Sequence, residues 1–179
     1  MKLEKLLTQP ESKTLEFKSD LSSFAPILKT IVAFANTAGG VLIIGRSPEG
    51  ILLGFEDVFK AEEQLSNVIA DDIAPSMLPD IEIATIGEKN ILIVKVPCWK
   101  GPFYLKKQGM PGGVYIRLGS ASVPAGPAIL AELQRAVTHQ SFDAQPITEL
   151  SIESLDLEKA NLLFNKVGRV LSSSLFYRQ

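Results

Sequence analysis

The stretch Ala33-Phe34-Ala35-Asn36-Thr37-Ala38-Gly39-Gly40-Val41-Leu42-Ile43-Ile44-Gly45 joins the most regular predicted helix of this 179-residue chain to its most apolar predicted strand. Upstream of it, apolar residues recur at helical spacing, which predicts a helix over residues 23–36 with one buried face. Asn36 and the pair Gly39-Gly40 tolerate left-handed backbone angles, which commonly end helices. Residues 41–44 are apolar at every position, which predicts a central strand that is covered on both faces.

The rest of the pattern predicts an α+β fold with a mixed, largely antiparallel sheet and flanking helices. Further helices are predicted over residues 1–8, 57–73 and 127–138, and further strands over 14–18, 51–55, 80–86, 91–96 and 114–118. Turn residues at 47–50 and 87–90 predict two hairpins. We expect a domain over residues 1–138, followed over 139–179 by a linker and a last helix that Ser154 or Asp156 caps. We expect residues 139–179 to be a truncated connector.

Composition argues against several classes of protein. No apolar run approaches the roughly 20 residues that cross a bilayer, so no membrane partner is expected. Residues 1–7 lack the apolar core and cleavage site of a secretory signal, and the expected location is cytoplasmic. Cys98 is the only cysteine and His139 the only histidine, which disfavours disulfides, zinc clusters and Cys/His or Ser/His catalytic pairs.

The charged residues are unevenly distributed along the chain. Residues 49–88 are strongly acidic, with Lys60 as their one opposing charge, whereas residues 89–131 contain no Asp or Glu. The cations of this acid-free segment are Lys89, Lys95, Lys100, Lys106, Lys107 and Arg117. Two interpretations stay open at this point: the segment forms an anion-binding surface, or the two sets of charges pair across the fold.

Four blocks in order resemble the Schlafen/AlbA-like family of domains, to which DNA binding is attributed. They are Glu11-Ser-Lys-Thr-Leu-Glu16-Phe17-Lys18, the stretch 33–45, Gly54, and Val114-Tyr-Ile-Arg117-Leu-Gly119-Ser120 with Pro124-Ala125. The resemblance covers residues 8–138. It implies the N-terminal part of a bacterial transcriptional regulator, which a helix-turn-helix region often follows in that family.

The resemblance also raises a catalytic alternative. In animal members the same domain is associated with metal-dependent cleavage of transfer RNA, and here Glu11 and Glu16 match two of the metal-binding carboxylates and Lys18 the neighbouring lysine. Such carboxylates would hold Mg²⁺ or Mn²⁺, which activates water and neutralises the scissile phosphate.

The third carboxylate of that family pattern is an Asp shortly after the strand that ends at Gly45. This chain has Arg46-Ser47-Pro48 there, and Glu49 is the nearest acid. Because an arginine favours phosphate and opposes a dication, this position favours a binding protein over a nuclease.

The leading hypothesis is therefore a nucleic-acid-binding module of a transcriptional regulator, with DNA or RNA as partner and no cofactor. The expected phosphate contacts are Lys18, Arg46, Lys100, Lys106, Lys107, Arg117, Ser120 and Ser122. Trp99, Phe103, Tyr104 and Tyr115 are interleaved with the loop lysines as in proteins that bind single strands, although we expect two of these four rings in the core.

Three other interpretations stay open. In the first, Glu11, Glu16 and Lys18 form ion pairs on the outward face of strand 14–18, together with Arg117 or Arg46. Alternatively, the chain is a metal-dependent ribonuclease that uses Glu11 and Glu16, or a homo-oligomer in which the acidic segment of one copy contacts the basic segment of another.

Overall fold

The computed structural model describes residues 3–138 and 156–168. The chain divides into two units, residues 1–139 and 140–179. The elements of the first unit are α1 (Leu3–Leu7), β1 (Leu15–Lys18), α2 (Phe24–Ala35), β2 (Gly40–Ile44), α3 (Val58–Asp72), β3 (Ile73–Ala74), β4 (Asp80–Ile86), β5 (Lys89–Val96), β6 (Tyr104–Leu105), β7 (Tyr115–Leu118), β8 (Ala121–Pro124) and α4 (Pro127–Thr138).

The second unit contributes one described element, α5 (Leu157–Lys166). Asp156, one of the two residues predicted to cap this helix, accepts a hydrogen bond from the backbone N–H of Lys159 at 3.1 Å. The predicted linker lies outside the described residues. No helix in the described ranges is long and apolar enough to cross a membrane.

The main sheet has the strand order β1-β2-β5-β4. β1 runs parallel to β2, whereas β5 pairs antiparallel with both β2 and β4. The predicted α+β class with a mixed, largely antiparallel sheet is confirmed, and β2 lies in the interior of the sheet with Leu42, Ile43 and Ile44 fully buried.

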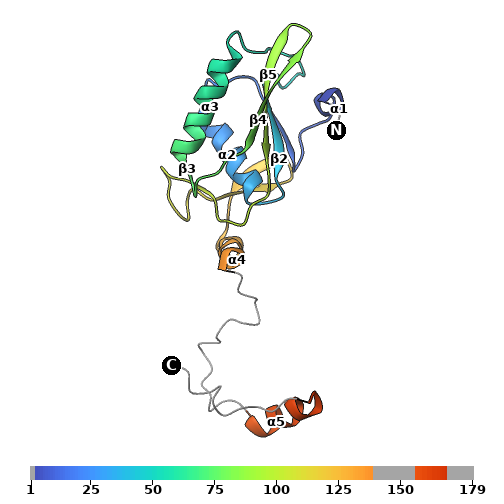
Figure 1. The fold of residues 1–179 in the computed structure, drawn as a ribbon, viewed down its shortest axis with the longest axis vertical. Coiled ribbons are helices and arrows are strands. Elements are labelled where there is room, and N and C mark those ends of the chain that lie inside the picture. The colour runs from blue at the N-terminus through green and yellow to red at the C-terminus, as the bar shows by residue number, and fades with distance from the viewer. Residues whose placement is uncertain (1–2, 139–155, 169–179) are drawn as a thin grey trace. The chain divides into compact units, whose positions relative to one another are not determined.

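Helices cover both faces of this sheet, with α2 and α3 on one face and α1 on the other (Figure 1). The alternation of β2 divides its apolar side chains between two clusters. Leu42 and Ile44 pack with residues of α2 and α3, whereas Ile43 packs with Leu15 and Phe17 of β1. A strand that is apolar at every position is therefore needed here, because neither of its faces meets water.

Two details of the sheet differ from the sequence predictions. Residues 51–55 form no strand. Instead, the backbone N–H groups of Leu53 and Gly54 both donate to the carbonyl of Gly45, at 2.8 Å and 3.0 Å, which is not a strand pairing. Gly45 and Gly54 have φ angles of 110° and 69°, which only glycine adopts readily. Conversely, the segment after β7 was not predicted as a strand, but it forms β8 and pairs antiparallel with β7.

The turn between α2 and β2 uses its residues differently from the prediction. Asn36 has a φ of −83°, in the right-handed region, so Gly39 with a φ of 71° supplies the left-handed backbone by itself. A side chain at Gly39 would also approach the carbonyl oxygen of Val96 to 2.7 Å. The turn thus packs backbone against backbone, which requires glycine at this position.

Asn36 instead uses its side chain to connect distant segments. Its Nδ2 donates to the carbonyls of Phe103 (2.8 Å) and Tyr115 (3.0 Å), and its Oδ1 accepts the N–H of Phe103 (2.8 Å). Asn36 is buried, with 6% of its surface exposed. A buried amide with three hydrogen bonds fixes the loop before β7 against the end of α2.

We expect Asn36→Ala to lower the free energy of unfolding by about 2–3 kcal/mol, because it leaves the backbone groups of Phe103 and Tyr115 buried without partners. Urea denaturation followed by circular dichroism measures the change. The matched control is Asn67→Ala on the exposed side of α3, for which a change within about 0.5 kcal/mol is expected. Equal effects of the two substitutions would contradict the assigned role of Asn36.

Candidate nucleic-acid interface

Glu16 of β1 is a buried carboxylate between two cations. In register it lies beside Leu42, so it shares the sheet face that α2 covers, and only 7% of the residue is exposed. Its Oε2 accepts a hydrogen bond from Nη2 of Arg117 at 2.9 Å, and its Oε1 from Nζ of Lys18 at 2.5 Å. The expected outward position of Glu16 is wrong, whereas the predicted ion pair with Arg117 is confirmed.

Arg117 connects the β7–β8 hairpin to the segment before β1. Its Nη2 also donates to the carbonyl of Ser12 (2.7 Å), and its Nη1 donates to the hydroxyl of Ser122 (3.0 Å). The side chain is 1% exposed, so phosphate cannot reach its guanidinium in this fold. This is a correction to the predicted phosphate contacts: Arg117 has a structural role, and the Ser122 hydroxyl is one of its acceptors.

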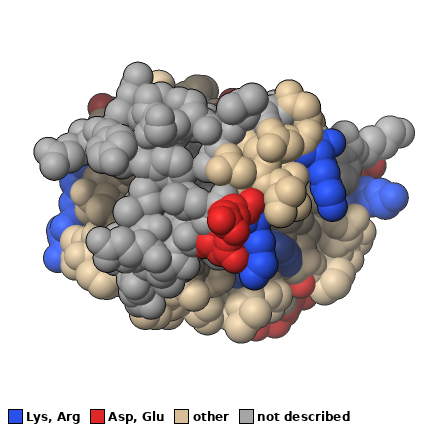
Figure 2. All heavy atoms as spheres, turned by 90° about the horizontal axis from the view of Figure 1, so that it is seen from below, with Lys and Arg blue, Asp and Glu red and all other residues tan. Residues whose placement is uncertain are grey.

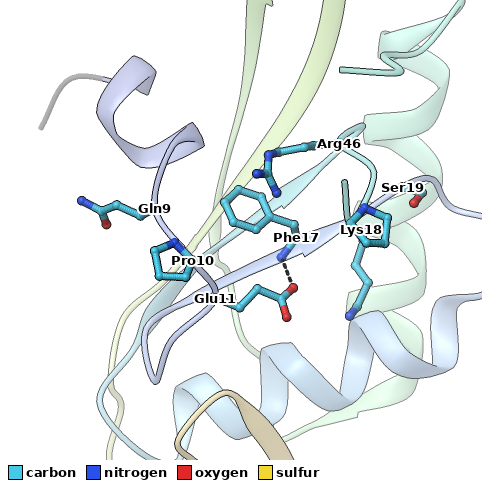
Figure 3. A pocket seen from close by; sticks show the side chains of 8 residues that line it. Gln9, Pro10, Glu11, Phe17, Lys18, Ser19 and Arg46 are labelled. Atoms are coloured by element: carbon cyan, nitrogen blue, oxygen red, sulfur yellow. Dashed lines mark hydrogen bonds between the residues drawn. The ribbon is translucent and has the colours of Figure 1, made fainter. Parts of the chain in front are cut away.

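A cleft of about 530 Å³ lies beside β1, with several of the predicted site residues in its wall (Figure 3). We call it the β1 cleft, and its lining is Gln9, Pro10, Glu11, Phe17, Lys18, Ser19, Arg46 and Pro48. Glu11 is fixed there because its Oε1 accepts the backbone N–H of Phe17 at 3.0 Å. The guanidinium carbon of Arg46 lies 3.9 Å from the centre of the Phe17 ring. Glu11, Lys18 and Arg46, each a site candidate from the sequence, therefore line one cleft, whereas Glu16 does not line it.

The position of Arg46 leaves part of its hydrogen-bonding capacity unused. Its Nε is buried and has no hydrogen-bond partner within the described part of the chain. A side chain at Gly50 would approach Nη2 of Arg46 to 3.2 Å, so the following turn stays close to the guanidinium without covering it with a side chain. The aromatic ring below Arg46 restricts its orientation and adds a cation–π attraction.

The carboxylates do not fit a divalent metal. Both oxygens of Glu16 already accept from cations, and Arg46 lies in the cleft wall near Glu11. Glu49 is exposed and is not part of the cleft lining; a hydrogen bond from the Ser47 hydroxyl lowers the pKa of its carboxyl. Among the residues that the structure describes, no group of three His, Cys, Asp or Glu side chains could hold a metal ion.

The loop lysines contact the acidic segment of the same chain. Lys106 donates through Nζ to the carbonyl of Ala70 (3.0 Å), and Lys107 pairs with Asp72 (3.0 Å) at the end of α3. Lys95 likewise pairs with Asp80 and Glu82 across the β4–β5 hairpin. Pairing between the two charge segments is thereby confirmed for Lys95 and Lys107. Figure 2 draws one face of the molecule, on which the visible basic and acidic side chains form no large patch of one sign.

The remaining predicted contacts are distributed over other parts of the first unit. Lys100 and Ser120 are exposed and do not line the β1 cleft, and their roles stay predictions. Two of the four aromatic residues, Phe103 and Tyr115, are buried as expected. Sequence reasoning missed Gln9 and Ser19 as cleft residues; their one signal was that they flank the block 11–18.

The fold and the cleft together define a mixed-sheet domain in which an arginine and a lysine hold the buried carboxylate of β1. The chain belongs to the Schlafen, AlbA_2 family, whose model matches residues 11–126. A search of the curated proteins found no match.

Two of the solved structures that this chain resembles illustrate the likeness. One is the N-terminal domain of a RecG-related protein from Nitrosomonas europaea, with 28% identity, a TM-score of 0.51, and coverage of 69% of this chain and 90% of that one. The other is the DIP2311 protein from Corynebacterium diphtheriae, with 19% identity and a TM-score of 0.55; the match covers 75% of this chain and 27% of that one. The second likeness concerns the fold alone.

We expect Glu16→Gln to lower the free energy of unfolding by about 3 kcal/mol, because it leaves the Arg117 guanidinium buried without a counter-charge. Arg117→Met should lower the free energy of unfolding by a similar amount. The double variant should lower it by less than the sum of the two single effects. Urea denaturation of the four proteins measures the coupling. Glu82→Gln, at an exposed pair, is the control and should change stability by less than about 1 kcal/mol. Additive losses would contradict the pairing.

Divalent cations provide a separate test of the carboxylates. Because Lys18 and Arg117 already hold Glu16, we expect millimolar Mn²⁺ or Mg²⁺ to leave the melting temperature unchanged, since only a ligand that binds the folded state raises it. Differential scanning fluorimetry measures this. A rise in melting temperature that Glu11→Gln abolishes would show that a metal site exists here.

Proposed function

We propose that this chain is a nucleic-acid-binding module that takes the sugar-phosphate backbone of DNA or RNA in the β1 cleft. The observation that carries the proposal is Arg46, which is half-buried in the cleft wall with its guanidinium carbon 3.9 Å from the centre of the Phe17 ring. A pre-oriented guanidinium is well suited to phosphate, because its planar donors match two phosphate oxygens.

The charge around the cleft also supports phosphate binding. Glu11 and Glu16 contribute two negative charges, and Lys18, Arg46 and Arg117 contribute three positive ones, which leaves one positive charge. Glu16 is shielded behind its two cations, whereas Glu11 lies in the cleft lining and opposes an anion. Arg46 and Lys18 therefore attract the sugar-phosphate backbone of the nucleic acid, and Glu11 limits how strongly this backbone binds.

The relatives support the same class of ligand. DNA binding is attributed to the family, and the name of the Nitrosomonas europaea protein relates it to an ATP-dependent DNA helicase. Lys100, Lys106, Lys107 and Ser120 belong to the proposal as secondary contacts outside the cleft. The finer assignment, a module of a transcriptional regulator, is supported by the family resemblance.

We expect labelled duplex DNA, single-stranded DNA or RNA to bind at low salt, with an affinity that falls linearly on a logarithmic salt scale. Arg46→Gln should weaken binding and reduce the salt slope by about one, because one phosphate contact is lost. Glu11→Gln should strengthen binding, because it removes the opposing charge. Fluorescence anisotropy measures the affinities.

Lys89→Gln is the matched control, because it changes the net charge by the same amount at the first residue of β5, which does not line the cleft. If Lys89→Gln and Arg46→Gln weakened binding equally, the cleft would not be the site. Absence of binding at low salt for all three nucleic acids would overturn the proposed function itself.

A further inference from the structure

A second cleft, which the proposed function does not use, surrounds the single tryptophan of the chain. We call it the Trp99 cleft; it has a volume of about 300 Å³, and its lining is Ser76, Met77, Leu78, Trp99 and Phe103. We propose that it binds one unpaired nucleobase by stacking against Trp99. This inference rests on the proposed function, because the base belongs to the nucleic acid whose backbone the β1 cleft takes.

The aromatic platform is rigid before any ligand arrives. The Trp99 and Phe103 rings lie 5.7 Å apart at 44°, and Phe103 is 5% exposed, so it supports the indole from inside. Asn36 bonds to the backbone N–H and the carbonyl of Phe103, and the backbone N–H of Trp99 donates to the carbonyl of Ala35 at 3.1 Å. Because these bonds fix the main chain that carries both rings, binding requires little ordering of the loop.

The accessible part of the cleft is mostly apolar, with the exposed Ser76 as its one polar side chain besides the indole N–H. Trp99 is half-buried, and Leu78 is 88% exposed at the rim, which makes it one of the most exposed large apolar side chains among the described residues. Neither an acid nor a base is part of the lining. An indole face next to an aliphatic side chain suits the flat, weakly polar face of a nucleobase.

Charge favours a nucleobase over an apolar peptide side chain as the occupant. The loop 97–113, which carries Trp99 and Phe103, contains no acid, and Lys100 directly follows Trp99, whereas Lys106 and Lys107 already contact Ala70 and Asp72 of α3. An anionic backbone is complementary to this loop. Bases inside a duplex are already stacked on their neighbours, so only an unpaired base can offer its face to Trp99.

The chain contains one tryptophan, so its fluorescence reports this cleft directly. We expect single-stranded oligothymidine and oligouridine to quench Trp99 emission as they bind, whereas a duplex bound to the same extent should leave the emission unchanged. Anisotropy of labelled oligonucleotides measures binding independently. Trp99→Leu should weaken single-strand binding about tenfold, as loss of one base stack does, and Trp99→Phe should retain most of the affinity.

Two further variants separate stacking from effects on folding. Leu78→Ala alters an exposed residue and should reduce both the quenching and the single-strand affinity without changing the melting temperature. Phe59→Ala, at a 71% exposed ring of α3 that does not line the cleft, should change neither. Full retention of affinity in Leu78→Ala and Trp99→Leu would overturn the inference.

The outcomes distinguish this inference from the proposed function. Single-strand binding by anisotropy with unchanged Trp99 emission would overturn the stacking site and leave the β1 cleft as the interface. Equal quenching by single strand and duplex would show that the base need not be unpaired. Emission that changes with protein concentration alone would identify a second copy of the chain as the occupant. Absence of any binding would overturn the proposed function together with this inference.

Discussion

The three hydrogen bonds of the Asn36 amide are the constraint on which both clefts depend. Asn36 stands at the end of α2, and its side chain joins Phe103, beneath the Trp99 cleft, to Tyr115 at the start of β7. The next residue continues the connection, because the Thr37 hydroxyl accepts the N–H of Arg117 at 3.0 Å. Arg117 in turn holds Glu16, and Glu16 holds Lys18 in the wall of the β1 cleft. One helix end thereby positions loops that are far apart in the sequence.

The buried charges have a different role from the exposed ones. Lys18, Glu16 and Arg117 form a row that runs from the β1 cleft to the interior, with side-chain exposures of 26%, 9% and 1%. The inner pair specifies how the β7–β8 hairpin docks on β1, since a misplaced hairpin would leave a charge buried without a partner. Lys18, at the outer end, is the cation of this row that solvent and ligands can reach. The same three residues therefore contribute to both structure and charge at the surface.

Local patterns predicted the parts of the fold that local physics determines. The apolar period of α2, the glycines after it and the uniformly apolar β2 were enough to predict the helix, the turn and the central strand. The strand predicted over residues 51–55 is wrong, because the positive φ angles of Gly45 and Gly54 bend the chain there and the apolar Ile51 and Leu53 stay 62% and 43% exposed. The burial of Glu16 was beyond local reasoning, since the partner that buries it is 101 positions away. Arg46 was predictable as a site residue because it lies two positions after the end of β2, which pairs with β1. Trp99 and Phe103 were predicted as candidate rings of a single-strand binder, but the rest of their cleft was not, because Ser76 and Leu78 carry no signal.

The charge of Arg46 has a consequence beyond this chain. The family resemblance implies an aspartate among the residues shortly after Gly45, where this chain has Arg46-Ser47-Pro48, and Arg46 lies over the Phe17 ring in the lining of the cleft that also contains Glu11. Exchanging that acid for arginine changes the local charge by two units while the surrounding backbone can stay the same. The charge of the residue at this turn is therefore one sequence feature that predicts whether the cleft of a relative attracts cations or, as proposed for this chain, anions.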